Sequence, residues 1–384
     1  MEYRSFGSTN CQVSALGFGC MRLPTLGDDN GKIDEPQAIN MIRAAIDQGV
    51  NYIDTAWGYH REQSEPLVGK ALSDGYREKV HLATKLPSWL IHSQGDMKHY
   101  LSVQLERLQT DHIDFYLLHT LNARYWQNYV DLRVFDWAEK EMASGRIRHL
   151  GFSFHDEYPV FERILNGYDH WDFCQIQYNY MDVAYQAGER GLRAAAEKGL
   201  GVVVMEPLRG GSLASPTPPP PVAKAFSQSQ RDWTPVEWAL QWLWNQPEVS
   251  LVLSGMSNPI QTQQNITSAG RSGVGKLTAD DLAVMANVQE AWNGLAPVPC
   301  THCEYCMPCP HGVQIPEVFR IYNTAAIYDN RARGRDDYKN AISDDGKADC
   351  CVECGECEAL CPQHIEIIQK LKDAHVYLSP EVSG

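Results

Sequence analysis

Residues 80–118 read VHLATKLPSWLIHSQGDMKHYLSVQLERLQTDHIDFYLL and hold one complete repeat of the pattern that decides the fold. An apolar run over Val80–Thr84 is followed by a segment of helical period over Met97–Leu108 and by a second apolar run over Ile113–Leu118. Two short strands joined through a helix are typical of a parallel sheet, whose right-handed crossovers place the helices on its faces. This stretch therefore predicts an α/β protein.

The same pattern recurs along the chain up to Ser254, and we count eight strand–helix pairs. The expected strands are Ala15–Gly19, Tyr52–Asp54, Val80–Thr84, Ile113–Leu118, His149–Ser153, Phe173–Gln177, Gly201–Met205 and Val249–Leu253, with helical segments such as Gln37–Asp47, Phe135–Ala143, Gly191–Lys198 and Pro235–Trp244 between them. Eight repeats over about 250 residues suit a closed (β/α)8 barrel, the TIM barrel. An open doubly wound sheet is the alternative, but its G-x-G-x-x-G turn is missing after the first strand. The barrel is favoured.

Composition and charge narrow the classes of partner. The 384 residues carry 33 Lys and Arg against 48 Asp and Glu, a formal charge of −15, which repels a phosphate backbone and argues against nucleic-acid binding. The sequence contains no run of about eighteen apolar residues, so it predicts no membrane-spanning helix. Residues Met1–Ser5 lack the basic and apolar regions of a secretory signal. We expect a cytoplasmic protein that acts on a small molecule.

Prolines mark two places where the strand–helix pattern is interrupted. Ser215–Pro221 contains five prolines and predicts an exposed, stiff loop without helix. A helical stretch that starts near Thr278 ends at Ala296–Pro299, which predicts a domain boundary. We therefore expect the barrel over residues 1–295 and a second domain over residues 296–384.

Four ionisable residues follow the expected strands at their C-terminal ends, where the active sites of such barrels lie. Asp54 closes the second strand, Tyr59 lies in its loop, Lys85 follows the third strand and His119 follows the fourth. Each alone has a structural explanation: an Asp that binds loop amides, a packed Tyr, a His with satisfied hydrogen bonds. Together on adjacent strands they indicate a common site.

This set suits the reduction of a carbonyl group. A buried ammonium at Lys85 would stabilise the phenolate of Tyr59 and bring its pKa closer to neutrality. Asp54 would be the counter-ion that keeps the buried lysine charged. Neutral His119 would donate a hydrogen bond that orients a carbonyl oxygen against the Tyr59 hydroxyl.

The motifs Asp54-Thr55-Ala56-Trp57-Gly58-Tyr59, Ala83-Thr84-Lys85 and Leu118-His119 resemble the catalytic tetrad of the aldo/keto reductase superfamily. The resemblance extends over roughly residues 1–290, including Gly151-Phe152-Ser153 and Cys174-Gln175-Ile176-Gln177-Tyr178. It implies a (β/α)8 barrel with NADPH or NADH bound across its mouth, and Tyr59 as general acid and base.

The resemblance also implies a set of cofactor contacts. Ser153 and Gln175 would contact the nicotinamide carboxamide, while Gln264 and Asn265 would lie near the adenine. The remaining expected contacts are Met205, Pro207, Leu208 and Gly255.

This chain departs from the family pattern at three places. Where many relatives place an aromatic ring against the nicotinamide after the seventh strand, this chain reads Met205-Glu206-Pro207-Leu208-Arg209-Gly210. Where they have Asn after the Ser of the fifth strand, it has Phe154-His155. Residues 254–265 contain no Lys or Arg that would bind an adenosine 2′-phosphate, so the choice between NADH and NADPH stays open.

Nine of the twelve cysteines follow Pro299, and eight of them form two runs. The second run, Cys351-x2-Cys354-x2-Cys357-x3-Cys361-Pro362, has the spacing of bacterial two-cluster ferredoxins, in which the fourth cysteine ligates the other cluster. The first run is one residue shorter before its last cysteine. By this rule Cys300, Cys303, Cys306 and Cys361 bind one 4Fe-4S cluster, and Cys309, Cys351, Cys354 and Cys357 bind a second.

Two structural zinc sites are the alternative for these runs, although zinc motifs rarely extend through three C-x2 steps into a proline. Cys350 is left over and is interpreted as a free thiol near a cluster. Helical patterns over Pro316–Tyr328 and Ile365–Val376 predict a small, helix-rich, ferredoxin-type domain. A barrel followed by such a domain resembles a subgroup of the aldo/keto reductases.

Three functions follow from the combination. In the first, the chain is an oxidoreductase that acts on a carbonyl or alcohol substrate, which includes sugar-like compounds, and its clusters pass single electrons from a soluble electron carrier to the barrel site or its bound cofactor. In the second, the clusters only stabilise the tail of an ordinary NAD(P)H carbonyl reductase. In the third, the chain is an electron-transfer or redox-sensing protein whose barrel does not catalyse.

Overall fold

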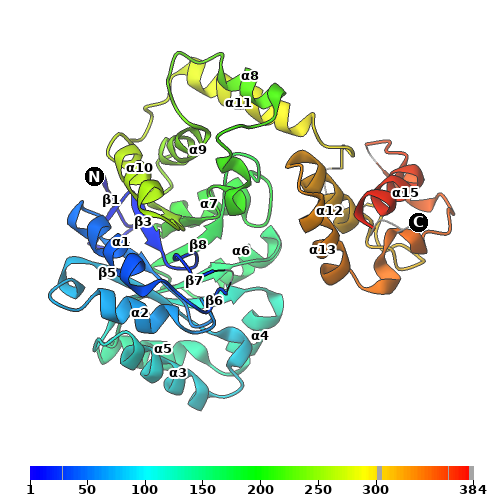
Figure 1. Cartoon of the computed structure of the whole chain (residues 1–384). Coiled ribbons are helices and arrows are strands. Elements are labelled where there is room, and N and C mark those ends of the chain that lie inside the picture. The colour runs from blue at the N-terminus through cyan, green and yellow to red at the C-terminus, as the bar shows by residue number, and fades with distance from the viewer. Residues whose placement is uncertain (28, 301–304, 362, 380–384) are drawn as a thin grey trace. The chain divides into compact units, whose positions relative to one another are not determined.

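The computed structural model describes residues 1–27, 29–300, 305–361 and 363–379 (Figure 1). Within these residues, parallel strands close into an eight-stranded barrel in the order β10-β3-β4-β5-β6-β7-β8-β9. The barrel strands are β3 (Leu16–Gly19), β4 (Tyr52–Asp54), β5 (His81–Leu86), β6 (Ile113–Leu121), β7 (Ile147–Phe154), β8 (Phe173–Gln177), β9 (Gly201–Met205) and β10 (Leu251–Ser254). The predicted (β/α)8 barrel is confirmed.

Helices surround the barrel and supply the outer layer of its core (Figure 1). They are α1 (Glu35–Asp47), α2 (Ser64–Ala71), α3 (Gln94–Arg107), α4 (Ala123–Asp131), α5 (Val134–Ala143), α6 (Tyr158–Asn166), α7 (Gly188–Glu197), α9 (Pro235–Trp244) and α10 (Pro259–Ala269). Local sequence fixes where they start: the Ser93 hydroxyl accepts from the Asp96 amide at the start of α3, while the Asp96 carboxylate accepts from the Ser93 amide. None of the helices among the described residues has the length and apolarity needed to cross a membrane.

A short antiparallel hairpin precedes the barrel. It pairs β1 (Tyr3–Ser5) with β2 (Gln12–Ser14), and between them the fully buried Phe6 packs its ring 4.6 Å from Phe115 and 5.5 Å from Phe173. These rings belong to a cluster inside the barrel that is separate from the helix-covered core. The sequence does not predict this hairpin, because strands of three residues carry too little alternation to detect.

The proline-rich segment differs from its prediction. Helix α8 (Pro220–Phe226) begins inside the stretch that we expected to contain no helix. Proline is accommodated in the first turn because the amide there has no partner within the helix and the ring presets a helical φ. The expectation of a non-helical loop is therefore wrong for Pro220 and Pro221.

The chain divides into two compact units, Met1–Pro216 with Arg231–Leu282, and Thr217–Gln230 with Ala283–Gly384. The second unit contains most of α11 (Ala279–Asn293), followed by α12 (Ile315–Ile327), α13 (Arg331–Ala341), α14 (Glu356–Leu360) and α15 (Ile367–Leu378). Its own apolar core includes Phe319, Leu371 and Cys361. The tail is thus helix-rich, as predicted.

Candidate active site

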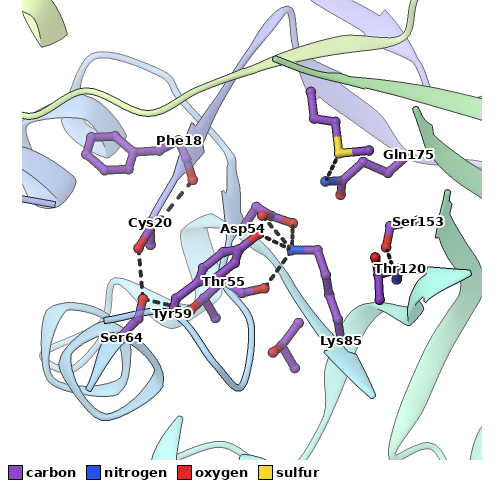
Figure 2. A network of polar contacts seen from close by, with 12 residues as sticks. Phe18, Cys20, Asp54, Thr55, Tyr59, Ser64, Lys85, Thr120, Ser153 and Gln175 are labelled. Carbon is purple, nitrogen blue, oxygen red and sulfur yellow. Dashed lines mark hydrogen bonds and ion pairs between the residues drawn. The ribbon is translucent and has the colours of Figure 1, made fainter. Parts of the chain in front are cut away.

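Lys85 is the centre of the polar group inside the barrel mouth (Figure 2). Its Nζ lies 2.7 and 2.8 Å from the two carboxylate oxygens of Asp54 and 2.8 Å from the carbonyl oxygen of Thr55. The same Nζ donates to the Tyr59 hydroxyl at 3.4 Å. Lys85 is fully buried and Asp54 is 2% exposed, so the ammonium is held inside the protein by these oxygens.

Burial and charge set the ionisation of this group together. Burial lowers the pKa of Lys85, but the Asp54 carboxylate and the Tyr59 hydroxyl outweigh it, so the pKa is raised and the amine stays charged. Burial raises the pKa of Tyr59, and the lowering by Lys85 only partly offsets it. The pKa of Tyr59 is therefore raised overall by burial, while Lys85 shifts it in the expected, lowering direction.

His119 owes its position to an irregularity in β6. The β6–β7 register shifts between Leu118 and Leu121, so His119 lies in a bulge within the strand and not after it. Thr120, next in sequence, has a φ of 57°, a left-handed conformation that is rare for a β-branched residue. Its amide donates to the Ser153 hydroxyl at 2.6 Å, which secures the bulge. Such bulges redirect side chains at functional sites.

The imidazole of His119 is neutral. Burial and then the charge of Lys85 hold its pKa well below the usual value. Its ring centroid lies 6.3 Å from that of Tyr59 and 5.2 Å from that of Trp89. Its Nδ1 is buried without a hydrogen-bond partner among the described residues. The tetrad residues predicted from the sequence therefore meet around one mouth.

Three of the expected cofactor residues lie on neighbouring strands at the same mouth. Ser153 on β7 is the register partner of Gln175 on β8, and Met205 ends β9. The Gln175 side-chain nitrogen lies 3.4 Å from the Met205 sulfur. Its Oε1 is buried and accepts from no described residue. An amide oxygen without a donor fits the N–H of a nicotinamide carboxamide.

The other expected contacts are spread over two loops and one helix. Pro207 and Leu208 follow β9, and Gly255 follows β10. Gln264 is exposed on α10, whereas Asn265 on the same helix is 5% exposed and donates to Ser254 Oγ at 3.0 Å. The side chain of Asn265 is thus already engaged inside the protein.

Sequence reasoning missed several groups that hold the tetrad. The Ser64 hydroxyl donates to the Cys20 carbonyl at 3.0 Å and lies 2.8 Å from the Thr55 hydroxyl, so it ties the start of α2 to the ends of β3 and β4 next to Asp54 (Figure 2). It also missed Arg22, whose guanidinium lies 3.5 Å from Glu206 and whose side chain packs on Gly255. No local pattern marks these residues, because their partners are distant in sequence.

Four of the tail cysteines lie around one cavity. Cys309, Cys351, Cys354 and Cys357 line one cavity together with apolar side chains such as Ile315 and Leu371. The first of these thiols comes from the first cysteine run and the other three from the second run. No disulfide joins any of the described cysteines. Four cysteine thiols are the kind of donor set that holds a cubane cluster. As the side chains stand, no three His, Cys, Asp or Glu residues among the described ones are grouped closely enough to hold a metal ion.

The other expected ligand set is described in part. Cys303 lies outside the described residues, as does Pro362. Cys361 belongs to the buried core of the tail, and Cys300 and Cys306 pack against that core. The thiol of the left-over Cys350 donates to the Asp344 carbonyl at 3.2 Å.

Comparison with known proteins identifies the barrel. The sequence model of the aldo/keto reductase family matches residues 15–288, more than two thirds of the chain. The chain belongs to the aldo/keto reductase family. A model described as a 4Fe-4S dicluster domain matches residues 299–366. The protein is therefore an aldo/keto reductase-type oxidoreductase with a C-terminal 4Fe-4S domain.

Individual relatives agree with this assignment. The aldo/keto reductase chain is 30% identical to an uncharacterized oxidoreductase, YrpG, of Bacillus subtilis over 56% of its own length and 68% of the relative. It is 26% identical to an NADH-specific methylglyoxal reductase of Escherichia coli over 76% and 99% of the two chains. A holo-form aldo-keto reductase of Bacillus halodurans superposes with a TM-score of 0.63 at 28% identity, covering 76% of this chain and 97% of that one.

Proposed function

We propose that the chain interconverts a small carbonyl compound and its alcohol with NADPH or NADH, with Tyr59 as the general acid and base. The observation that carries this proposal is the position of Lys85 Nζ, which contacts both Asp54 carboxylate oxygens and the Tyr59 hydroxyl. When bound, the reduced nicotinamide supplies the hydride that reaches the carbonyl carbon. Tyr59 then transfers its hydroxyl proton to the carbonyl oxygen, which gives the alcohol.

The neighbours of Tyr59 divide the remaining tasks. Lys85 stabilises the phenolate that forms as the proton leaves, and Asp54 keeps Lys85 charged. Neutral His119 donates a hydrogen bond that orients the carbonyl oxygen. Ser153 and Gln175 would hold the nicotinamide carboxamide. The proposed further cofactor contacts are Met205, Pro207, Leu208, Gly255, Gln264 and Asn265.

We propose two clusters in a tail domain that extends over residues 296–384. Cys309, Cys351, Cys354 and Cys357 would hold one, which their shared cavity supports. Cys300, Cys303, Cys306 and Cys361 would hold the other. When bound, each cubane accepts or gives a single electron. A soluble electron carrier is the proposed second partner, beside the carbonyl or alcohol substrate.

The test compares variants of the iron-loaded full-length protein. Tyr59→Phe should abolish the oxidation of NADPH or NADH by methylglyoxal, the substrate named for one relative, while nucleotide binding measured by fluorescence quenching is retained. Tyr76→Phe is the matched control, because its hydroxyl bonds Asp47 at 2.9 Å in an exposed contact. Full activity of Tyr59→Phe would refute the acid–base role. Failure of the wild-type chain to bind either nucleotide would favour an electron-transfer or redox-sensing protein.

A further inference from the structure

The loop that carries Tyr59 has a backbone that needs support from outside. His60, Arg61 and Glu62 follow Tyr59 directly and have φ values of 51°, 50° and 71°. Consecutive non-glycine residues in the left-handed region are costly and persist only where neighbouring groups hold them. The residues that hold this loop therefore influence where the Tyr59 hydroxyl lies.

Arg107, the last residue of α3, contacts this loop twice. Its guanidinium carbon lies 3.8 Å from the ring centroid of Trp57, two residues before Tyr59. Its Nη2 lies 2.7 Å from the Glu62 carboxylate, three residues after Tyr59. The guanidinium thus bridges the two sides of the Tyr59 turn, from a helix that carries none of the tetrad.

The same guanidinium reaches the strand of Lys85 through a fully buried carboxyl group. Arg107 Nη1 lies 3.3 Å from Glu65, which is 0% exposed. Glu65 accepts from the Thr84 hydroxyl and from Gln104 Nε2, both at 2.7 Å. Gln104 Nε2 also donates to the Lys85 carbonyl at 2.9 Å. Four hydrogen bonds and ion pairs therefore connect α3, Glu65 on α2 and β5, and one of them reaches the backbone of the tetrad lysine.

A glycine allows α3 to come this close. Gly69 on α2 lies one turn after Glu65, and a Cβ at this position would lie 2.5 Å from the Arg107 carbonyl oxygen. The end of α3 is therefore in backbone contact with α2, and a side chain at residue 69 would push the two apart.

We propose that Arg107 is a positioning residue that sets the distance between Lys85 Nζ and the Tyr59 hydroxyl by joining the Tyr59 loop to the Lys85 strand through Glu65. Lys85 lowers the pKa of the phenol at this distance, and a larger distance weakens that effect. The proposal rests on the acid–base role of Tyr59, but its structural part can be measured without turnover.

The test uses Arg107→Met, Arg107→Lys and a control in the full-length, iron-loaded protein. Arg146→Met is the control, because Arg146 forms a comparable partly buried pair with Glu141 at 2.9 Å on the same barrel. Hydrogen–deuterium exchange should accelerate at least about tenfold in the peptide spanning residues 56–63 for Arg107→Met, since the local opening free energy of this loop falls. The control should leave this peptide unchanged.

Activity gives the second readout. For Arg107→Met, kcat for methylglyoxal reduction should fall by about 10- to 100-fold, the scale of a 1 Å misplacement. The alkaline limb of its kcat–pH profile should move to higher pH, because Tyr59 loses part of the lowering by Lys85. Arg107→Lys should fall between Arg107→Met and wild type.

The two readouts separate the ways in which the reasoning can fail. Unchanged exchange at residues 56–63 in Arg107→Met would overturn the positioning role, whatever the activity. Faster exchange with an unaltered pH profile would overturn the link to Tyr59. If Tyr59→Phe were fully active while the exchange effect was present, the acid–base assignment would fail and the connection between loop and strand would stand.

Discussion

Replacing Lys85 by methionine tests the buried ion pair that organises the mouth of the barrel. The substitution keeps the length of the side chain but leaves the Asp54 carboxylate, 2% exposed, without its cation. Removing one partner of a buried pair costs about 3–5 kcal/mol, because a charge stays buried and uncompensated. The closeness of Nζ to both Asp54 oxygens, 2.7 and 2.8 Å, indicates that little water screens this pair.

The free energy of unfolding and the melting temperature are the measured quantities. At about 2–4 °C per kcal/mol for a domain of this size, Lys85→Met should melt about 6–20 °C below wild type. Adding Asp54→Asn to Lys85→Met should restore most of the loss, because the buried charge is removed. Arg146→Met, which breaks a more exposed pair, should cost about 1 kcal/mol.

Calorimetry and urea unfolding measure these stabilities for the wild type, Lys85→Met, the double variant with Asp54→Asn, and Arg146→Met. The reasoning would be refuted if Lys85→Met had the same melting temperature as Arg146→Met. It would also be refuted if adding Asp54→Asn to Lys85→Met lowered the melting temperature further. In either case Asp54 would have other compensation in the folded protein, and the electrostatic account of Tyr59 would lose its basis.

Three further outcomes are expected. His119→Gln should lower kcat about 100-fold or more. The melting temperature should not fall, because the buried Nδ1 of His119 has no hydrogen-bond partner among the described residues to lose. A loss of unfolding free energy above about 1 kcal/mol would contradict this. Asp281, paired with Arg231 at 2.6 and 2.7 Å and hydrogen-bonded by Thr278, has a pKa lowered to about 2. The ionised carboxylate therefore stabilises the protein above the unfolded pKa near 4, by about 1 kcal/mol once solvent screening is allowed for, and this stability is lost as pH falls towards 2. Acid titration of Asp281→Asn should show a flatter stability curve. Cys309→Ser and Cys354→Ser should each lose about half of the bound iron and the same EPR signal, because both thiols line one cavity. Loss of different EPR signals in the two variants would mean that the crossing rule is wrong for this chain.

The sequence predicted the barrel well because each barrel strand is a short buried run. The predicted Tyr52–Asp54, Phe173–Gln177 and Gly201–Met205 match β4, β8 and β9, and the other five strands differ only at their ends. The spacing of Asp54, Lys85 and His119 on adjacent strands was also sufficient to place them at one mouth.

What the sequence could not predict depends on contacts between distant residues. The left-handed Thr120 and the bulge at His119 arise from pairing with β7, which no local pattern specifies. The contact between Arg107 and Glu65 joins residues 42 positions apart, and either one alone reads as an ordinary charged helix residue. The net upward shift of the Tyr59 pKa required the degree of burial, which only the folded chain provides.

The hairpin in front of the barrel has a consequence for where the protein can change. Phe6 and its aromatic neighbours fill the bottom of the barrel, so packed side chains close that end of the barrel. Loops at the opposite rim can vary in length and composition while this closed end stays intact. Substitutions in the rim loops, natural or engineered, could therefore change the compound on which such an enzyme acts while Phe6 and its packing stay unchanged.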